Sequence, residues 1–382
     1  MNICHIITRM IIGGAQENTV LSCRGLAERG HRVTLVTGPT RGPEGRLLDT
    51  HSDREPFQTL EAKSLVRALN PPADCRAYRQ VRRILREGDF DVVHTHSSKA
   101  GILGRLAAWR LGVPVVVHTV HGQAFHPYQS RWRNRLYIAL ERSAARRCHH
   151  IFAVAQAMVD QCVAAGIADR DFYSVVYSGM DLEPYIRAER DLEMRARLGI
   201  PDDAVVVGKI ARLFELKGHD ALLSAVPRLA ESVPSLRVLL VGDGDQRAEL
   251  ERMASELGIA ERVVFAGLVP PSDIPSYVAQ MDVLAHFSLR EGLPRAVVQA
   301  LAAGVPAVAY ELDGTPEVVQ TGQTGILCPP LDRVAAENAL LALLRNPEAR
   351  RKMGANGRAR VRTRFDWRTM VESLERQYER LR

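Results

Sequence analysis

Two cations, Arg212 and Lys217, share one loop after a short apolar run at residues 204–210. Cations on a single loop can converge on the same anion, and fixed Arg and Lys side chains stabilise the charge that develops on a departing diphosphate. A divalent metal performs this task in other proteins. The pair therefore indicates an anion site that works without a metal, although either residue alone would be an ordinary surface charge.

The segment 291–306 has the sequence EGLPRAVVQALAAGVP. Pro294 suits the first position of a helix, where its missing N–H costs nothing, and the amides of that first turn can bind phosphate oxygens. Glu291 stands just ahead, where it can accept hydrogen bonds from sugar hydroxyls, and Gln299 lies roughly 7 Å further along the axis at ~1.5 Å per residue. A ligand with a sugar at one end and a ribose beyond a diphosphate would span that gap. The alternative is that Glu291 only favours the helix dipole.

Gly13 and Gly14 follow the first apolar run and open a helical pattern. Glycines there let the backbone approach a ligand closely, and the helix start offers N–H groups to an anion; a plain tight turn would have the same sequence. Gly242 and Gly244 come nearest to the G-x-G-x-x-G dinucleotide motif but lack its third glycine, and no G-x-x-x-x-G-K-[ST] P-loop is present. These absences argue against a dehydrogenase and a P-loop kinase.

Short apolar runs alternate with helical patterns along almost the whole chain. Several runs are apolar without alternation, as in parallel strands that are covered on both faces. The sequence therefore predicts a doubly wound α/β protein, in which ligands bind beyond the carboxyl ends of the strands. We expect strands at 2–7, 32–37, 91–95, 114–119, 150–155, 173–177, 204–210, 236–241, 262–266, 281–286, 305–310 and 325–328, with helices such as 15–29, 77–86 and 221–232 between them.

The length of 382 residues indicates two domains. A turn-rich stretch at 178–184 suggests the boundary. We expect an N-terminal Rossmann-like domain at 1–180, a C-terminal Rossmann-like domain at 181–365, and an amphipathic helix at 366–382 that returns toward the first domain. Two such sheets facing each other would form a deep cleft.

Composition and thiols are typical of a globular cytoplasmic protein. Hydrophobic residues make up 46% of the chain and charged residues 25%, close to the average of soluble domains. The six cysteines are scattered without a CxxC pair, which indicates reduced thiols and argues against a zinc site or a disulfide framework. We find neither a secretory signal nor the ~20 apolar residues that span a bilayer, so we expect a cytoplasmic protein that is soluble or peripheral on the inner face of the cell membrane.

The positive charge is concentrated in the first half of the chain. Residues 1–185 hold 24 Lys and Arg against 17 Asp and Glu, whereas residues 186–382 hold 27 of each. The segment 105–147 contains eight arginines and a single acid, Glu141. This asymmetry suggests an anionic partner for the first domain, although a solvated basic helix face would explain it equally well.

Within that segment, Trp132, Leu136 and Leu140 share one helical face among arginines. Such a helix could rest on anionic lipid, or it could pack its apolar face into the core and leave a wet basic side. The chain has only 5% aromatic residues and no nucleic-acid-binding motif, so we expect no nucleic-acid partner.

Four histidines lie at the ends of two neighbouring expected strands. His94 and His96 share one side of a strand, and His118 and His121 flank the end of the next. A metal site could be built from such spacing, but no Asp, Glu or Cys stands beside them at ligand spacing, so we expect no metal ion. We expect His94 or His118 to bond to backbone or neighbouring hydroxyl groups.

Together these segments resemble family 4 of the retaining glycosyltransferases, which have the GT-B fold, over nearly the whole chain. The resemblance rests on Gly13–Ala15, Asp91–Gly101, Val117–Gly122, Ser178–Asp181, the loop with Arg212 and Lys217, and Glu291–Pro306.

The resemblance implies a role for each matched residue. In this family one Glu contacts the donor sugar and a second contacts the donor ribose; Glu291 matches the first, whereas Gln299 occupies the second position. An amide can still bond a ribose diol, as one donor and one acceptor and without charge. Gln16, where many members have Glu, is a second departure. By the same resemblance His121 lies beside the reacting sugar, Arg212 and Lys217 hold the diphosphate, and the donor-binding backbone includes Gly13, Gly14, Gly292, Leu293 and Pro294.

The implied activity is transfer of a hexosyl or N-acetylhexosaminyl group from a nucleotide diphosphate sugar, with retention of anomeric configuration and with the leaving phosphate helping to deprotonate the acceptor. A UDP-sugar is the favoured donor and GDP-mannose the alternative. The acceptor would be a glycan or a polyprenyl-linked glycan on the first domain, the second domain would bind the donor, and no metal or other cofactor is expected. Two rival functions stay open: a nucleotide-sugar epimerase on the same fold, and a non-catalytic nucleotide-sugar binding protein.

Overall fold

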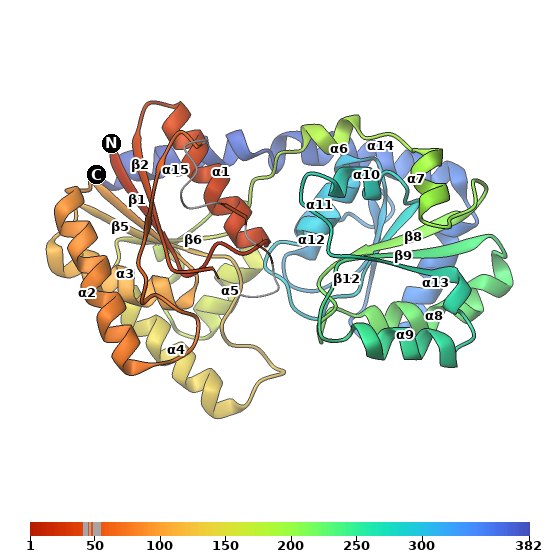
Figure 1. The fold of residues 1–382 in the computed structure, drawn as a ribbon, viewed down its shortest axis with the longest axis horizontal. Helices are drawn as coiled ribbons and strands as arrows, with labels where there is room; N and C mark the ends of the chain where they lie inside the picture. The colour runs from red at the N-terminus through yellow and green to blue at the C-terminus, as the bar shows by residue number, and fades with distance from the viewer. Residues whose placement is uncertain (41–44, 46, 49–54) are drawn as a thin grey trace. The chain divides into compact units, whose positions relative to one another are not determined.

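The computed structural model describes residues 1–40, 45, 47–48 and 55–382. The chain forms two compact units (Figure 1). Unit 1 consists of Met1–Met180 and Phe365–Arg382, and unit 2 consists of Asp181–Arg364.

Unit 1 contains a parallel sheet which, within the described residues, has seven strands in the order β3-β2-β1-β4-β5-β6-β7. The strands are β1 (Asn2–Ile7), β2 (Arg32–Thr37), β3 (Gln58–Glu61), β4 (Val92–His96), β5 (Val115–Val120), β6 (His150–Ala153) and β7 (Tyr173–Val175). Strand β1 pairs with β2 on one side and β4 on the other, so the winding of the chain reverses between β1 and β4. In doubly wound sheets this switch point is where ligands bind, beyond the carboxyl ends of the strands.

Unit 2 repeats this plan with six described strands, in the order β10-β9-β8-β11-β12-β13. They are β8 (Val205–Ile210), β9 (Leu236–Val241), β10 (Val263–Gly267), β11 (Val283–His286), β12 (Ala307–Tyr310) and β13 (Gly325–Cys328). Here the switch point lies between β8 and β11, because β8 pairs with β9 and with β11.

Helices lie on both faces of each sheet (Figure 1), and the expected doubly wound α/β fold is confirmed. Unit 1 contains α1 (Gly14–Glu28), α2 (Pro71–Gly88), α3 (Ser98–Leu111), α4 (Arg131–Ala145), α5 (Gln156–Ala164) and α15 (Trp367–Leu381). Unit 2 contains α6 (Glu183–Arg187), α7 (Leu192–Arg197), α8 (His219–Ser232), α9 (Arg247–Glu256), α10 (Ile274–Val278), α11 (Arg295–Ala302), α12 (Thr315–Val318), α13 (Arg333–Leu344) and α14 (Pro347–Arg364).

Burial explains which strands the sequence revealed. Every residue of β1 and β4 is buried, because helices cover both faces of a doubly wound sheet. Such strands carry apolar residues on both faces instead of alternating with polar ones, although β4 also buries His94, Thr95 and His96. Strand β3 was not predicted. Its four residues, QTLE, are half-buried or exposed at the edge of the sheet beside β2, so they carry no apolar run.

Helix α15 completes the core of unit 1. Gly25 on α1 allows α15 to approach closely, because a Cβ at Gly25 would lie 2.5 Å from Val371 Cγ2. The two helices run side by side (Figure 1). The face of α15 that joins this core consists of Trp367, Met370, Val371, Leu374 and Tyr378.

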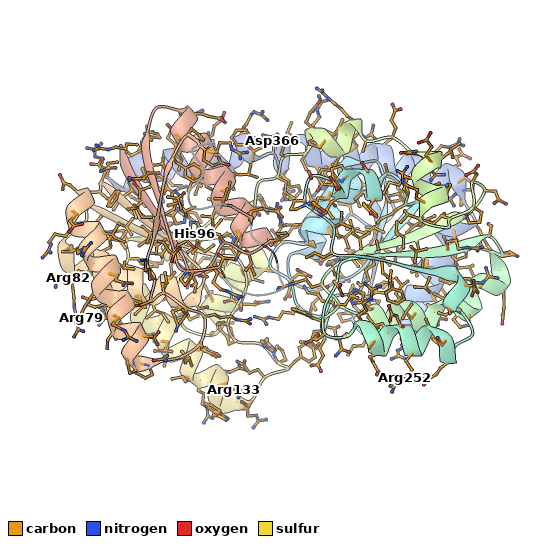
Figure 2. The ribbon with its side chains drawn as sticks, in the orientation of Figure 1. Arg79, Arg82, His96, Arg133, Arg252 and Asp366 are labelled. Atoms are coloured by element: carbon orange, nitrogen blue, oxygen red, sulfur yellow. The ribbon has the colours of Figure 1, made fainter. Side chains whose placement is uncertain are left out.

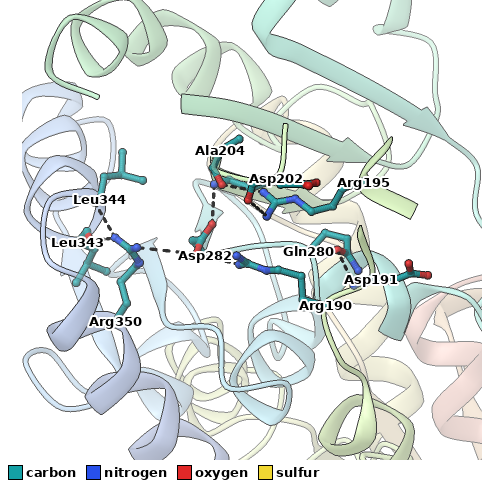
Figure 3. A network of polar contacts seen from close by, with 11 residues as sticks. Arg190, Asp191, Arg195, Asp202, Ala204, Gln280, Asp282, Leu343, Leu344 and Arg350 are labelled. Atoms are coloured by element: carbon teal, nitrogen blue, oxygen red, sulfur yellow. Dashed lines mark hydrogen bonds and ion pairs between the residues drawn. The ribbon is translucent and has the colours of Figure 1, made fainter. Parts of the chain in front are cut away.

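The segment between the boundary and β8 is anchored within unit 2 by Asp282 (Figure 3). The Asp282 carboxylate accepts a hydrogen bond from the backbone N–H of Val206 at 2.8 Å and pairs with Arg190 at 3.0 Å. Nearby, Arg195 donates to the carbonyl of Ala204 at 2.8 Å. These contacts hold α7 and the segment before it against the sheet of unit 2.

Two absences hold for the described part of the chain. No helix there combines the length and the apolar character that crossing a membrane requires. None of the six cysteines forms a disulfide there, and five of them are buried while Cys75 is exposed.

Candidate functional site

The switch point of unit 2 brings the predicted donor-site residues onto adjacent strand ends. Arg212 and Lys217 follow β8, and Glu291 follows β11, the strand hydrogen-bonded to β8. Both loops therefore emerge at the edge of the sheet where doubly wound proteins bind ligands.

Lys217 and Glu291 form a direct ion pair at this edge. Lys217 Nζ donates to Glu291 Oε1 at 2.7 Å, and His286 Nε2 lies 3.6 Å from the same oxygen. Burial acts to raise the pKa of the Glu291 carboxyl, but the charge of Lys217 and its hydrogen bond outweigh burial, and the pKa lies below its ordinary value. Glu291 is therefore a carboxylate at neutral pH, able to accept hydrogen bonds from hydroxyl groups.

The backbone around Lys217 is held in a restricted conformation. Leu216 has φ 65° and Gly218 has φ 70°, in the left-handed region that disfavours side chains with a Cβ. A Cβ at Gly218 would lie 2.1 Å from the carbonyl oxygen of Phe287, and the Leu216 carbonyl accepts from Leu289 N–H at 2.8 Å. The loop after β8 is thus tied to the loop after β11, and these contacts fix the backbone position of Lys217. A non-glycine residue such as Leu216 in this conformation is a strain often found at functional sites.

The Glu291 loop is anchored by a residue that the sequence analysis missed. Asp313 Oδ2 accepts a hydrogen bond from the backbone N–H of Glu291 at 2.8 Å, and Gly314 N–H donates to the Gly292 carbonyl at 3.2 Å. Asp313 has φ 50°, a conformation that Asp tolerates better than most residues. The Asp-Gly turn sequence after the run at 305–310 was the available signal.

Gly242 and Gly244, which fail the dinucleotide motif, have a packing role. A Cβ at Gly242 would lie 2.1 Å from the Ala211 carbonyl oxygen, and one at Gly244 would lie 2.4 Å from that of Leu213. The loop after β9 therefore approaches the backbone on both sides of Arg212. The Arg212 guanidinium lies 4.8 Å from the centroid of the Phe214 ring, a cation–π contact.

Helix α11 begins at Arg295, so the expectation that Pro294 is its first residue is wrong by one position. Pro294 is the capping residue, and its carbonyl accepts from Val297 N–H at 3.0 Å and from Val298 N–H at 3.2 Å. The Pro294 carbonyl accepts these bonds because the residue stands directly before the first helical turn. The fixed φ of proline is compatible with both the capping position and the first position of the helix. Gly292 and Leu293 are buried beside it, and Gln299 is half-buried further along α11.

At the N-terminal end of α1 in unit 1, Gly13 precedes the helix and Gly14 is its first residue. Gln16 Nε2 donates to the carbonyl of Arg9 at 3.2 Å. A carboxylate cannot donate this bond, so the amide gives the loop after β1 a contact that Glu at this position would lack.

His121 stands at the end of a row of imidazoles in unit 1. His121 Nε2 lies 2.9 Å from His96 Nδ1, and His96 Nε2 lies 2.9 Å from His5 Nδ1; Figure 2 labels His96 within the unit. Burial lowers the pKa of His5 to about 3 and that of His96 well below its ordinary value. These two rings are therefore neutral. His5 was missed because it lies on β1, far from the other histidines in sequence.

His94 and His118 have structural partners, as expected. His94 Nδ1 lies 2.5 Å from the Tyr378 hydroxyl and His94 Nε2 lies 2.6 Å from Thr119 Oγ1, while His118 Nδ1 lies 2.9 Å from Thr95 Oγ1.

Ring nitrogens of His5, His94 and His96 lie within 4.8 Å of one another, close enough to share a metal ion. However, both nitrogens of His94 and both of His96 already have hydrogen-bond partners. An ion would have to displace these bonds, and the group fits a hydrogen-bonded network better than a metal site.

The basic segment of unit 1 is less exposed than its sequence suggests. Arg105 is fully buried and pairs with Glu141 at 2.7 Å, so it does not belong to a basic surface. On α4, by contrast, the shared face of Trp132, Leu136 and Leu140 is exposed by 63%, 44% and 36%. The alternative that this face packs into the core is wrong. Exposed arginines surround it, and Figure 2 shows Arg133 projecting from α4.

Comparisons with known proteins agree with this architecture. Residues 191–360 match the family model described as glycosyl transferases group 1, and residues 13–179 match that of a glycosyl transferase 4-like domain. The chain is 27% identical to the UDP-Gal:alpha-D-GlcNAc-diphosphoundecaprenol alpha-1,3-galactosyltransferase of Escherichia coli, over 89% of this chain and 87% of the relative. It is 30% identical to the D-inositol 3-phosphate glycosyltransferase of Nocardia farcinica, over 96% of this chain and 84% of the relative. The crystal structure of Anabaena HepE in complex with UDP-glucose superposes with a TM-score of 0.83 at 25% identity, with all of both chains covered.

Proposed function

Because this chain belongs to the retaining glycosyltransferases of family 4, which have the GT-B fold and transfer sugars from nucleotide sugars, we propose that it moves a hexosyl or N-acetylhexosaminyl group from a UDP-sugar to a glycan or polyprenyl-linked glycan. GDP-mannose is the second candidate donor. Unit 2 binds the donor and unit 1 the acceptor.

The observation that carries this proposal is the Lys217–Glu291 pair at the β8/β11 switch point. A nucleoside diphosphate gains negative charge as its sugar leaves, and Lys217 with Arg212 supplies fixed positive charge for it. Glu291 accepts hydrogen bonds from the sugar hydroxyls, with Gly292, Leu293 and Pro294 contributing backbone contacts. In this proposal His121 supports the reacting sugar, and Gly13 and Gly14 let the backbone approach the donor.

The choice of donor and acceptor has support from relatives. The E. coli relative takes galactose from UDP and acts on a diphosphoundecaprenol-linked sugar, as its name states, and HepE was crystallised with UDP-glucose. Both observations favour a uridine donor for this chain.

A donor panel tests the proposal. Thermal unfolding is measured with UDP-glucose, UDP-galactose, UDP-N-acetylglucosamine, GDP-mannose, ADP-glucose and TDP-glucose, because a ligand that binds only the folded state raises the melting temperature. A shift with a UDP-sugar is expected. The active donor is then incubated with a membrane extract, and labelled sugar is followed into product.

The same experiment separates the rivals. Conversion of the donor to an epimer without any acceptor would replace the transferase with an epimerase. Tight donor binding without transfer to any extract component would identify a binding protein. If no nucleotide sugar of the panel raised the melting temperature, the proposed function would be wrong.

Replacing Gln299 with Glu is expected to tighten binding of the active donor about three- to tenfold. A carboxylate accepts hydrogen bonds from both hydroxyls of a ribose, and charge-assisted bonds are roughly twice as strong as neutral ones. Affinity is measured by calorimetry. Gln323→Glu, on an exposed turn of the same unit, is the matched control and should change nothing; equal effects of the two variants would place the ribose elsewhere.

We also propose that α4 rests on an anionic lipid surface, because exposed Trp132 and Leu136 lie among exposed arginines. Apolar residues on a basic helix bind at the boundary of headgroups and acyl chains. This would bring unit 1 to the inner face of the cell membrane and to a polyprenyl-linked acceptor.

Replacing Trp132 and Leu136 together with Ser is expected to weaken binding to phosphatidylglycerol vesicles roughly tenfold or more, since each buried apolar side chain contributes about 1.5–3 kcal/mol when fully removed from water. Co-sedimentation at low and high salt measures it, and binding should fade as salt increases. Leu192→Ser, at an exposed leucine of unit 2, is the matched control. A wild-type chain that stays in the supernatant at low salt would end this proposal.

A further inference from the structure

A lysine lies in the interior of unit 2 without a hydrogen-bond partner. Lys209 is the fifth residue of β8 and is 1% exposed. Among the described residues, its Nζ has no hydrogen-bond partner. A buried ammonium without a partner is costly, since neither water nor an acceptor compensates its lost hydration. An apolar residue would fill this position of a parallel strand at no such cost.

The charged and titratable groups around Lys209 come from four elements. Lys217 lies on the loop after β8 and Glu291 on the loop after β11, and both act electrostatically on Lys209. His219 and Asp220 begin α8, and His286 ends β11. Lys209, on the strand that leads into the Lys217 loop, therefore interacts electrostatically with both members of the Lys217–Glu291 pair.

Two neighbouring histidines are also buried with a ring nitrogen that has no hydrogen-bond partner in the described part of the chain. His219 and His286 are buried, and the Nε2 atom of each has no hydrogen-bond partner among the described residues. Burial lowers the pKa of His219 to about 2 and that of His286 to about 3. Both rings are neutral at physiological pH, so they do not supply positive charge to the site.

Lys209 differs from the two histidines because its amine changes protonation state near neutral pH. Burial is the main cause that lowers the pKa of Lys209 to about 7, and the positive charge of Lys217 acts in the same direction. The negative charge of Glu291 acts in the opposite direction. A nearby anion raises the pKa of an amine. A diphosphate that arrives at this edge of the sheet will therefore favour the protonated form of Lys209.

The ion pair between Lys217 and Glu291 presents a problem for donor binding. In the structure Lys217 Nζ lies 2.7 Å from Glu291 Oε1, so a diphosphate must compete with a carboxylate for this ammonium. If Lys217 turned to the diphosphate alone, Glu291 would lose its counter-charge. A second cation close to Glu291 would remove that cost.

We propose that Lys209 is a positioning residue of the donor site: its amine takes up one proton from solvent when the donor diphosphate binds, and its ammonium then serves as the counter-charge of Glu291 while Lys217 holds the diphosphate. This inference rests on the proposed function. One proton moves from solvent to Lys209 Nζ for each donor bound, and no covalent bond is formed or broken.

The sign of the pH dependence follows from linkage. Below the pKa of the free amine Lys209 is already protonated, so donor affinity is highest and no proton is taken up. As the pH rises above about 7, binding must bring a proton with it, and affinity falls by at most about tenfold per pH unit. Above the pKa of the bound state the affinity levels off.

Isothermal titration calorimetry of the full chain tests the proposal. UDP-glucose and GDP-mannose are each titrated at pH 6, 7, 8 and 9, in two buffers with different ionisation enthalpies, so that the difference in heat gives the protons taken up. Both probes are diphosphate diesters without a titrating phosphate proton near neutral pH. The wild type is expected to take up close to one proton at pH 8 and almost none at pH 6.

Four variants complete the experiment, one of which, His286→Gln, tests the neighbouring histidine. Lys209→Met, with an unbranched apolar side chain, is expected to take up no proton and to bind with an affinity that is flat with pH and lower than wild type at pH 6. Lys209→Arg keeps its charge at every pH and is expected to bind without uptake and more tightly than Lys209→Met at pH 8. Lys352→Met, at an exposed lysine of the same unit, should retain the uptake of the wild type.

The outcomes separate this inference from the function on which it rests. Binding without uptake in the wild type overturns the inference, and this measurement does not depend on whether a variant folds. Equal uptake in the wild type and Lys209→Met also overturns it, and loss of uptake in His286→Gln instead would assign the proton to that histidine. Failure of the wild type to bind either probe, or any donor of the panel, overturns the proposed function and the inference with it.

Discussion

Replacing Lys217 with Ala is expected to lower kcat roughly 100- to 1000-fold, the loss typical of removing one fixed group that stabilises charge in the transition state. The Lys217 side chain is 25% exposed and pairs with Glu291, so its ammonium is held at the ligand edge of the sheet. The developing charge on the diphosphate is larger in the transition state than in the bound donor. The variant should therefore lose more in kcat than in donor affinity.

Initial rates with the donor identified by the panel, measured at several donor concentrations, give this division between kcat and KM. Lys217→Arg keeps a cation but not the compact geometry of an ammonium, and it should recover part of the lost rate. Lys352→Ala, far from the loop in sequence and exposed, serves as the unaffected control. Near-normal transfer by Lys217→Ala would show that the diphosphate is held elsewhere.

The strand pattern was predictable because of how parallel sheets are buried. Strands such as β12 are covered on both faces, so their sequences are apolar throughout and stand out against the helices. Once the strands were located, the rule that ligands bind at their carboxyl ends pointed to the loops of Lys217 and Glu291. Strand β3 escaped because an edge strand with half-buried polar residues has no such signature.

Contacts between strands could not be predicted in the same way. His5 and His96 lie 2.9 Å apart only because β1 and β4 are neighbours across the switch point, and strand order does not follow from spacing along one strand. Asp313 similarly follows the carboxyl end of β12 and accepts a hydrogen bond from the backbone N–H of Glu291. Lys209 was visible as a polar interruption in an apolar run, but its lack of a partner depends on the packing around it.

Charge counted along a sequence is also a poor guide to charge on a surface. Arg105 contributed to the basic segment as much as Arg133 did, yet the first is fully buried and the second is exposed. Trp132 shows the converse, because an apolar helical face would normally pack into a core, yet this side chain is exposed. Long-range packing decided both cases.

The buried Arg105 gives the second large effect: Glu141→Ala is expected to destabilise unit 1 by about 3 kcal/mol. Removing one member of a buried ion pair leaves an uncompensated charge, which costs roughly 3–5 kcal/mol, and the lower end applies because the Glu141 side chain is 15% exposed. Burial opposes the charge of Arg105, but Glu141 outweighs it and raises its pKa. Without Glu141 this guanidinium remains charged in the interior.

Urea unfolding followed by tryptophan fluorescence measures this cost, because all three tryptophans, Trp109, Trp132 and Trp367, lie in unit 1. Glu183→Ala breaks the exposed Glu183–Arg187 pair of unit 2 and should leave the transition unchanged. Adding Arg105→Met to Glu141→Ala should recover most of the lost stability, since removing both charges of a buried pair costs far less than removing one. If the double variant were less stable than Glu141→Ala alone, the contribution of Arg105 would lie in its hydrogen bond to the Gly101 carbonyl at 2.9 Å and in its packing, and the charge argument would fail.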